Sequence, residues 1–299
     1  MNTRSSLHIV ALSFAAVALL IPFRASAASI VRSIGGDATP ASITPTRDTF
    51  RLDIGGGTTP GANGSFGGVR REINWDGVPA TQSAPNNLAA NFFNSTSPRG
   101  AVFATPGTGF MVSGATTDAG TGQPASQNFG NINANYTTTF GQFTPQRLFT
   151  AIGSNITDVT FFIPGTATTA TVTGFGSVFT DVDTLGNATV QYFDQSNASL
   201  GIFNVPAATV GSQGLSFLGV SFNAGETIGR VRITSGTAAL GAGVNDGGAT
   251  DLVVMDDFIY SEPTTVPEPS TLGLCAAGLA GLLSARKRNR RVSQDEVPD

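Results

Sequence analysis

Short runs of apolar and β-branched residues, separated by Gly, Pro and Asn, recur along residues 158–260 at intervals of roughly 10 to 15 residues. Some runs alternate: Val231 and Ile233 stand between Arg230 and Arg232, which puts one face of the strand in the core and the other in water. No run of ten or more residues in this body has the 3.6-residue period of an amphipathic helix. The pattern predicts an all-β fold, an antiparallel β-sandwich. Strands are expected at 158–163, 169–175, 188–193, 200–205, 215–222, 228–234 and 251–260.

The folded body is expected to span residues 28–263. Its first part, 28–68, is rich in Gly, Thr, Pro and Ala and is predicted to be loosely ordered. One extended segment is expected there, at 49–54, where three apolar residues alternate with polar ones. The 21 Phe residues of the chain are enough to build a core, although only 12% of its residues are charged.

Charge and residue types exclude several function classes. Between residues 28 and 265 the chain holds nine Arg, no Lys and sixteen acidic residues, a net charge of about −7 that repels phosphate backbones. Nucleic acid is therefore not an expected partner. The only His, His8, and the only Cys, Cys275, lie outside this body. The body thus offers no disulfide, no Cys or His zinc ligand, and no Ser-His or Cys-His catalytic pair.

Residues 1–27 have the order of an export leader. Arg4 supplies a positive start, residues 9–23 an apolar stretch, and residues 25–27 a small-residue cleavage site. We expect a signal helix that the general secretion machinery uses and that is then removed. An uncleaved anchor is the alternative.

Residues 264–291 form a second export segment with three parts: a Pro-rich motif, an apolar run at 271–285, and a basic stop. As a transmembrane helix the run would be about 22 Å long, which is short against a hydrocarbon core near 30 Å, so it could only just cross. The basic stop holds its end on the cytoplasmic side, and 292–299 are expected to be a disordered cytoplasmic end. The motif is Val266, Pro267, Glu268, Pro269 and Ser270, and the stop is Arg286, Lys287 and Arg288.

This three-part order resembles the PEP-CTERM sorting signal of Gram-negative bacteria, which an exosortase recognises. The resemblance implies a protein that is exported across the inner membrane, tethered transiently by its tail, and then moved to the cell surface or beyond. It also implies removal of the tail near the Pro-Glu-Pro segment. Proteins with this signal are commonly associated with exopolysaccharide production. A permanent membrane anchor is the alternative.

The strand expected at 251–260 carries the adjacent acids Asp256 and Asp257, which are predicted to point to opposite faces. Asp257 would then lie among core-facing apolar residues, where an ionised carboxylate must be paired, hydrogen-bonded or bound to a cation. The strand resembles the closing strand of jelly-roll and lectin-like sandwiches, and this resemblance implies a structural calcium ion. The alternative is that Asp257 accepts backbone N–H groups or pairs with an arginine.

Asp181 and Asp183 flank Val182, a spacing that places both carboxylates on one side of an extended chain. Oxygen-rich clusters of this kind suit a hard cation such as calcium. The two aspartates could join Asp257 or Asp246 in space, and the alternative is a solvated turn. The candidate calcium ligands are therefore Asp181, Asp183, Asp256 and Asp257.

Aromatic and amide side chains suggest a sugar contact. Trp75, the only Trp, stands between Asn74 and Asp76, and with Tyr260 these residues are the candidate ligand-binding group. The alternative for Trp75 is a core anchor whose indole N–H finds one partner. Glu72, close by, is the residue on which a hydrolase acting through paired carboxylates would depend.

The sequence predicts an exported surface or extracellular-matrix protein that binds or forms part of the exopolysaccharide matrix. It is not expected to be an enzyme, and no residue is assigned a catalytic role. A carboxylate-dependent hydrolase of extracellular glycans and a purely structural coat or adhesion protein are the two alternatives.

Overall fold

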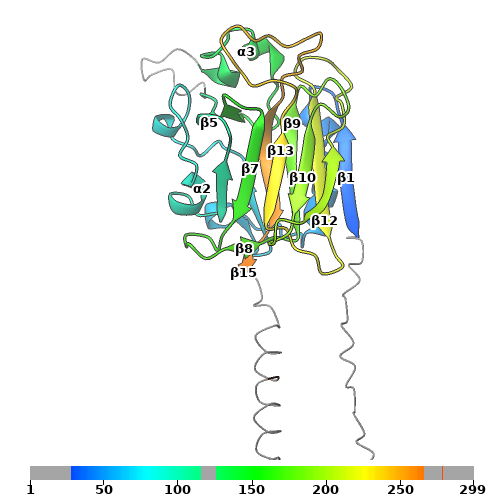
Figure 1. Cartoon of the computed structure of the whole chain (residues 1–299). Coiled ribbons are helices and arrows are strands. Elements are labelled where there is room, and N and C mark those ends of the chain that lie inside the picture. Colours follow the sequence, from blue (N-terminus) through cyan, green and yellow to red (C-terminus); the bar gives the residue numbers. More distant parts are fainter. Residues whose placement is uncertain (1–27, 116–125, 266–277, 279–299) are drawn as a thin grey trace, which may run out of the picture.

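The computed structural model describes residues 28–115, 126–265 and 278. The predictions for the leader 1–27, the sorting motif, the apolar run 271–285 and the basic stop therefore lie outside the described residues, residue 278 apart. Within the described part of the chain, no helix is both long and apolar enough to cross a membrane. This part is mostly β-strand, in antiparallel sheets with few helices, which confirms the fold prediction at that level (Figure 1).

The larger sheet has eight strands in the order β1-β12-β9-β14-β3-β2, with β6 also paired to β14 and β5 paired to β6. All of its pairings are antiparallel. Its strands are β1 (Ser29–Gly35), β2 (Ser65–Phe66), β3 (Arg70–Ile73), β5 (Gly109–Val112), β6 (Phe149–Ile152), β9 (Gly174–Thr180), β12 (Leu215–Phe222) and β14 (Val254–Ser261).

The smaller sheet has five strands in the order β11-β10-β13-β7-β4. Burial alternates along its inner strands, and Val231 and Ile233 are buried as predicted. A separate pair, β15 with β8, closes the described body. The strands are β4 (Ala101–Ala104), β7 (Ile156–Phe161), β10 (Thr189–Phe193), β11 (Ser199–Asn204) and β13 (Arg230–Thr234), with β8 (Ala170–Thr171) and β15 (Thr264–Thr265).

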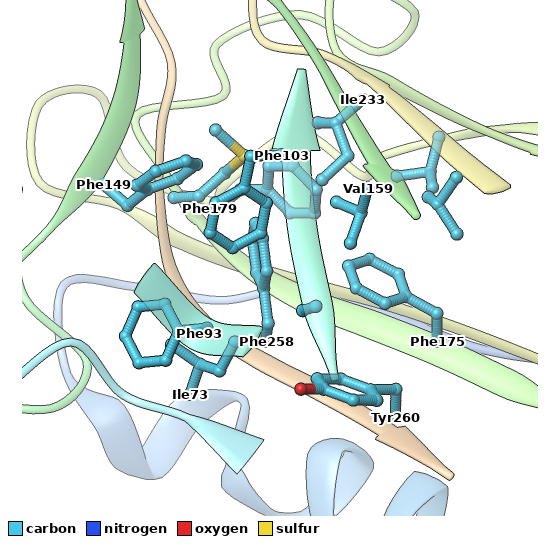
Figure 2. Packing of buried hydrophobic residues seen from close by; sticks show 14 of the residues in the cluster. Ile73, Phe93, Phe103, Phe149, Val159, Phe175, Phe179, Ile233, Phe258 and Tyr260 are labelled. Carbon is cyan, nitrogen blue, oxygen red and sulfur yellow. The ribbon is translucent and has the colours of Figure 1, made fainter. Parts of the chain in front are cut away.

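One apolar cluster joins the two sheets. Phe103 and Val159 from the smaller sheet belong to the same buried cluster as Phe175 and Phe258 from the larger one (Figure 2). Burying each such side chain contributes about 1.5–3 kcal/mol relative to leaving it exposed. The aromatic residues therefore hold the sheets together from within.

The outer face of the larger sheet is also covered, so β9, β12 and β14 are buried along their whole length. The cover is α1 (Thr44–Asp53), which together with Ile43 and Phe143 packs on the sheet in a second cluster. The other helices are short: α2 (Phe92–Ser95), α3 (Tyr136–Thr139), and the 3₁₀ turns η1 (Pro40–Ser42), η2 (Ala62–Gly64), η3 (Ala80–Gln82) and η5 (Gln127–Phe129).

The extended segment predicted at 49–54 is wrong, because α1 occupies most of it. Phe50 and Ile54 lie one helical turn apart and are both buried, whereas Leu52 is 73% exposed. Pro45 stands in the first turn, where its missing N–H does no harm. The alternation of apolar residues at 50, 52 and 54 therefore did not mark a strand. In the helix, Phe50 and Ile54 share the buried face and Leu52 points to solvent.

Two glycines make room for this helix. Gly176 and Gly219 are register partners on β9 and β12, directly beneath the Phe50 ring. A Cβ atom at Gly219 would lie 2.6 Å from the ring and one at Gly176 would lie 2.9 Å from it. The start of the body is regular rather than loosely ordered, since β1 pairs with β12 along seven residues and α1 follows.

Candidate functional site

Two groups of carboxylates, each with at least one buried member, stand out, and the first lies on β14. Met255 pairs with Phe179 and Phe258 with Ser177, so β14 has one residue more than β9 between these points, which is a β-bulge. Because of it, Met255 and Phe258 both face the core between the sheets. The prediction that Asp256 and Asp257 point to opposite faces is therefore wrong: both carboxylates contact Thr144.

Asp256 is fully buried and its carboxylate is well supplied with hydrogen-bond donors. Its Oδ2 accepts the backbone N–H of Phe143 at 2.7 Å and that of Thr144 at 3.2 Å. Its backbone carbonyl accepts the indole N–H of Trp75 at 2.6 Å. Burial, followed by the charge of Asp257, raises the pKa of Asp256 well above its ordinary value, while the bond from Phe143 opposes the shift.

Asp257 completes a cluster of three oxygens. The Thr144 hydroxyl lies 3.0 Å from Asp256 Oδ1 and 2.9 Å from Asp257 Oδ1, but its one hydrogen serves only one of them at a time. Burial raises the pKa of Asp257 to about 6, against the opposing effects of Asp256, Thr144 and Arg47. A proton shared within the carboxyl pair would supply the second hydrogen that this geometry needs.

Asp257 also lines a cavity of about 320 Å³ between α1, η2 and β3. Glu72 lines the same cavity, where Arg51 holds it through two hydrogen bonds of 2.7 Å and Arg70 through a third. Seven of the eleven residues that line it are polar or charged. The lining residues are Arg47, Arg51, Pro60, Gly61, Gly64, Phe66, Glu72, Asn74, Arg99, Thr144 and Asp257.

The second group joins three aspartates from loops at the end of β9 and before β14. Asp181, Asp183 and Asp246 each offer a carboxylate oxygen within 4.8 Å of the others. Asp181 has no exposed surface and neither of its carboxylate oxygens has a hydrogen-bond partner. Burial raises the pKa of Asp181 to about 8, and the carboxylates of Asp246, Asp183 and Asp251 add to the shift. The backbone N–H of Gln213 opposes it, but this N–H donates its hydrogen bond to the Thr139 carbonyl at 2.7 Å.

Asp251 supports this group by accepting hydrogen bonds from the loop that carries Asp183. Its Oδ2 accepts the backbone N–H groups of Asp183 and Thr184, both at 3.2 Å, and the side-chain amide of Asn187 at 2.9 Å. Its Oδ1 is buried without a partner. Asp246 is fixed in turn by the backbone N–H of Leu252, 2.8 Å from its Oδ1. The loops that carry the three aspartates are therefore tied to one another.

The structure brings only part of the predicted calcium set together. Asp181 and Asp183 lie side by side as their spacing predicts, and their third member is Asp246. Asp256 and Asp257 are not in this group; they form the pair on Thr144 instead.

The predicted sugar contacts divide between the core and the surface. Trp75 is 1% exposed and stacks on Phe149 with ring centroids 4.2 Å apart, so its faces are covered. Tyr260 is also in the core, and its hydroxyl donates to the Arg99 carbonyl at 3.0 Å. Asn74 is exposed, and Asp76 is half-buried. Neither aromatic ring offers a free face to a sugar.

Asp76 acts within the fold rather than on a ligand. Its Oδ1 accepts the backbone N–H of Gln146 at 2.6 Å, and its Oδ2 accepts the Asn74 amide at 3.2 Å. Burial raises the pKa of Asp76, and hydrogen bonds from the backbone of Gln146 and Arg147 oppose the shift. This aspartate anchors the turn that carries Trp75 to the chain segment before β6.

Sequence reasoning did not assign Thr144, Arg47 or Asp251 to a site. Thr144 and Arg47 carry no signal by type, because Thr and Arg are common surface residues. Asp251 and Asp246 stand in an Asn-, Asp- and Gly-rich tract before β14, whose composition points to a loop with oxygen ligands. Only the topology shows that this tract meets the residues after β9.

Comparison with known proteins identifies the tail. Residues 265–291 match the family of the PEP-CTERM protein-sorting motif. The match confirms the resemblance seen in the sequence, and it indicates exosortase-dependent sorting to the cell surface, with exosortase as the processing partner. It also implies secretion through a membrane-associated state. No curated protein and no solved structure matches the chain.

Proposed function

We propose that this protein is an exported, non-catalytic component of the cell surface or extracellular matrix, with a jelly-roll-like β-sandwich as its body. The observation that carries the proposal is the position of the sorting motif. The matched residues begin at Thr265, which is also the last residue of β15. The folded body is therefore the cargo that this signal delivers.

The cavity beside Asp257 is the proposed contact with exopolysaccharide. Arg47 and Arg99 line it together with the exposed amide of Asn74. Arg99 is half-buried, and burial is the main cause that lowers the pKa of its guanidinium. Guanidinium forks and amides suit carboxylate and hydroxyl groups, which are the recognition groups of acidic sugars. In this proposal the cavity takes over the contact that the sequence suggested for Trp75 and Tyr260.

The test follows the full chain in cells that contain exosortase and either make or lack exopolysaccharide. The expected result is that the body leaves the membrane fraction in both strains and stays in the matrix only where polysaccharide is present. Asn74→Ala and Arg47→Gln should weaken retention, whereas Gln191→Ala, on the smaller sheet, should not. Equal retention in the two strains would contradict a polysaccharide contact and leave the coat or adhesion role as the better account.

A hydrolase of extracellular glycans is the second candidate, because two acids face one cavity. Glu72 and Asp257 both line it, and the raised pKa of Asp257, about 6, is a property of general acids. Against this reading, Arg51 and Arg70 occupy the Glu72 carboxylate. Purified matrix polysaccharide should therefore gain no reducing ends with the wild-type protein. Reducing ends that form with the wild type and not with Asp257→Asn would overturn the non-catalytic proposal.

A further inference from the structure

The buried carboxylate of Asp181 has no hydrogen-bond donor to stabilise it. It has no exposed surface, and neither oxygen accepts a hydrogen bond. Removing a carboxylate from water without donors or a counter-ion is costly, so such a group is either protonated or bound to a cation. The charged groups that act most strongly on it are three further carboxylates, which make the ionised form still less favourable.

The geometry of the neighbours distinguishes these two outcomes. One proton would neutralise Asp181 but would leave the carboxylates of Asp183 and Asp246 close together. A divalent cation would neutralise more of the group at once. Ligand oxygens around calcium lie about 2.3–2.6 Å from the ion, so two of them can be up to roughly 5 Å apart. The 4.8 Å within which the three carboxylate oxygens lie fits this limit.

We propose that Asp181, Asp183 and Asp246 bind one calcium ion that ties the loop after β9 to the loop before β14. Oxygen ligands from two irregular loops suit calcium, which accepts six to eight ligands in flexible geometry, better than magnesium, which demands a near-ideal octahedron. Asp251 is a positioning residue: it accepts two backbone N–H groups from the first loop and leads into β14. The inference does not depend on the proposed matrix function.

Thermal unfolding of the full chain in detergent, stripped of metal and then titrated with calcium chloride alone, tests the proposal. A ligand that binds only the folded state raises the melting temperature, by roughly 5–10 °C at one hundred times its dissociation constant for a body of this size. Asp181→Asn and Asp183→Asn should lose most of this rise. Asp48→Asn, which changes a half-buried acid on α1 that pairs with Arg47 and Arg51, should keep it.

The two variants separate a metal ligand from a structural acid. Asp183 is exposed, so Asp183→Asn should fold as the wild type does, and it guards against a folding defect in Asp181→Asn. A wild-type chain whose melting temperature does not respond to calcium chloride would overturn the proposal, and so would an undiminished response in both variants. An equal rise with magnesium chloride would overturn the assignment to calcium.

Discussion

Asp256 and Asp181 are both fully buried but are stabilised in different ways. Asp256 receives two backbone N–H groups and shares the Thr144 hydroxyl with Asp257, beside the charge of Arg47. Asp181 receives no hydrogen bond and has carboxylates around it. The pair on β14 is thus completed by the protein itself, whereas the group after β9 is complete only with a cation. Burial of an acid is therefore not in itself a sign of a metal site. What indicates such a site is a buried carboxylate without hydrogen-bond donors or a cationic neighbour.

Among the variants that test this comparison, Asp256→Ala should have the largest effect on stability. The change leaves the backbone N–H groups of Phe143 and Thr144 buried without an acceptor, at about 1–3 kcal/mol for each. We expect a loss of about 3–5 kcal/mol in the free energy of unfolding, measured by urea denaturation without calcium. Asp256→Asn keeps an acceptor oxygen and serves as the control. Similar losses in both variants would mean that the charge, not the acceptor, matters.

The pH dependence of stability tests whether the carboxyl pair of Asp256 and Asp257 is protonated. Its folded-state pKa, about 6, lies above its ordinary value of 3.8, so the unfolded chain releases the proton first as the pH rises. The contribution of Asp257 to the free energy of unfolding should fall between about pH 4 and pH 6, by an amount on the order of 3 kcal/mol, and level off above. Asp257→Asn should lack this contribution. Parallel pH profiles for the wild type and the variant would contradict a protonated carboxyl pair.

Thr144→Val should give the smallest of these effects. The variant keeps the shape of the side chain but removes the hydroxyl that both aspartates contact, at an expected cost of about 1–2 kcal/mol. Thr144→Ser keeps the hydroxyl and should lie close to the wild type. Denaturation curves for the three proteins provide the measurement, and a Val variant as stable as the wild type would contradict a role for the hydroxyl.

Strands with a strong apolar pattern were predictable. The segment expected at 215–222 coincides with β12, and the expected alternation of Val231 and Ile233 is seen in β13. The short strands β2 to β6 were not predicted, because their two to four residues are too few to show a period. α1 was missed because Phe50, Leu52 and Ile54 fit an alternating pattern, and only packing on the glycines of the larger sheet selects the helix.

The candidate site was predictable in part. The spacing of Asp181 and Asp183 in an extended chain predicts that their carboxylates lie on the same side, and the structure places them together. Asp246 lies far along the chain from them, and only the topology of the larger sheet brings it near. The side on which Asp256 and Asp257 lie could not be predicted, since the alternation rule assumes a regular strand and the bulge after Met255 adds a residue.

Calorimetric titration of the metal-free full chain with calcium chloride at pH 7.5 tests the central claim most directly. The claim is that the group around Asp181 needs a cation and the pair on β14 does not. We predict one calcium ion bound per chain in the wild type and in Asp257→Asn, and none bound in Asp181→Asn. Binding that is absent from the wild type, or that disappears in Asp257→Asn and survives in Asp181→Asn, would contradict the account.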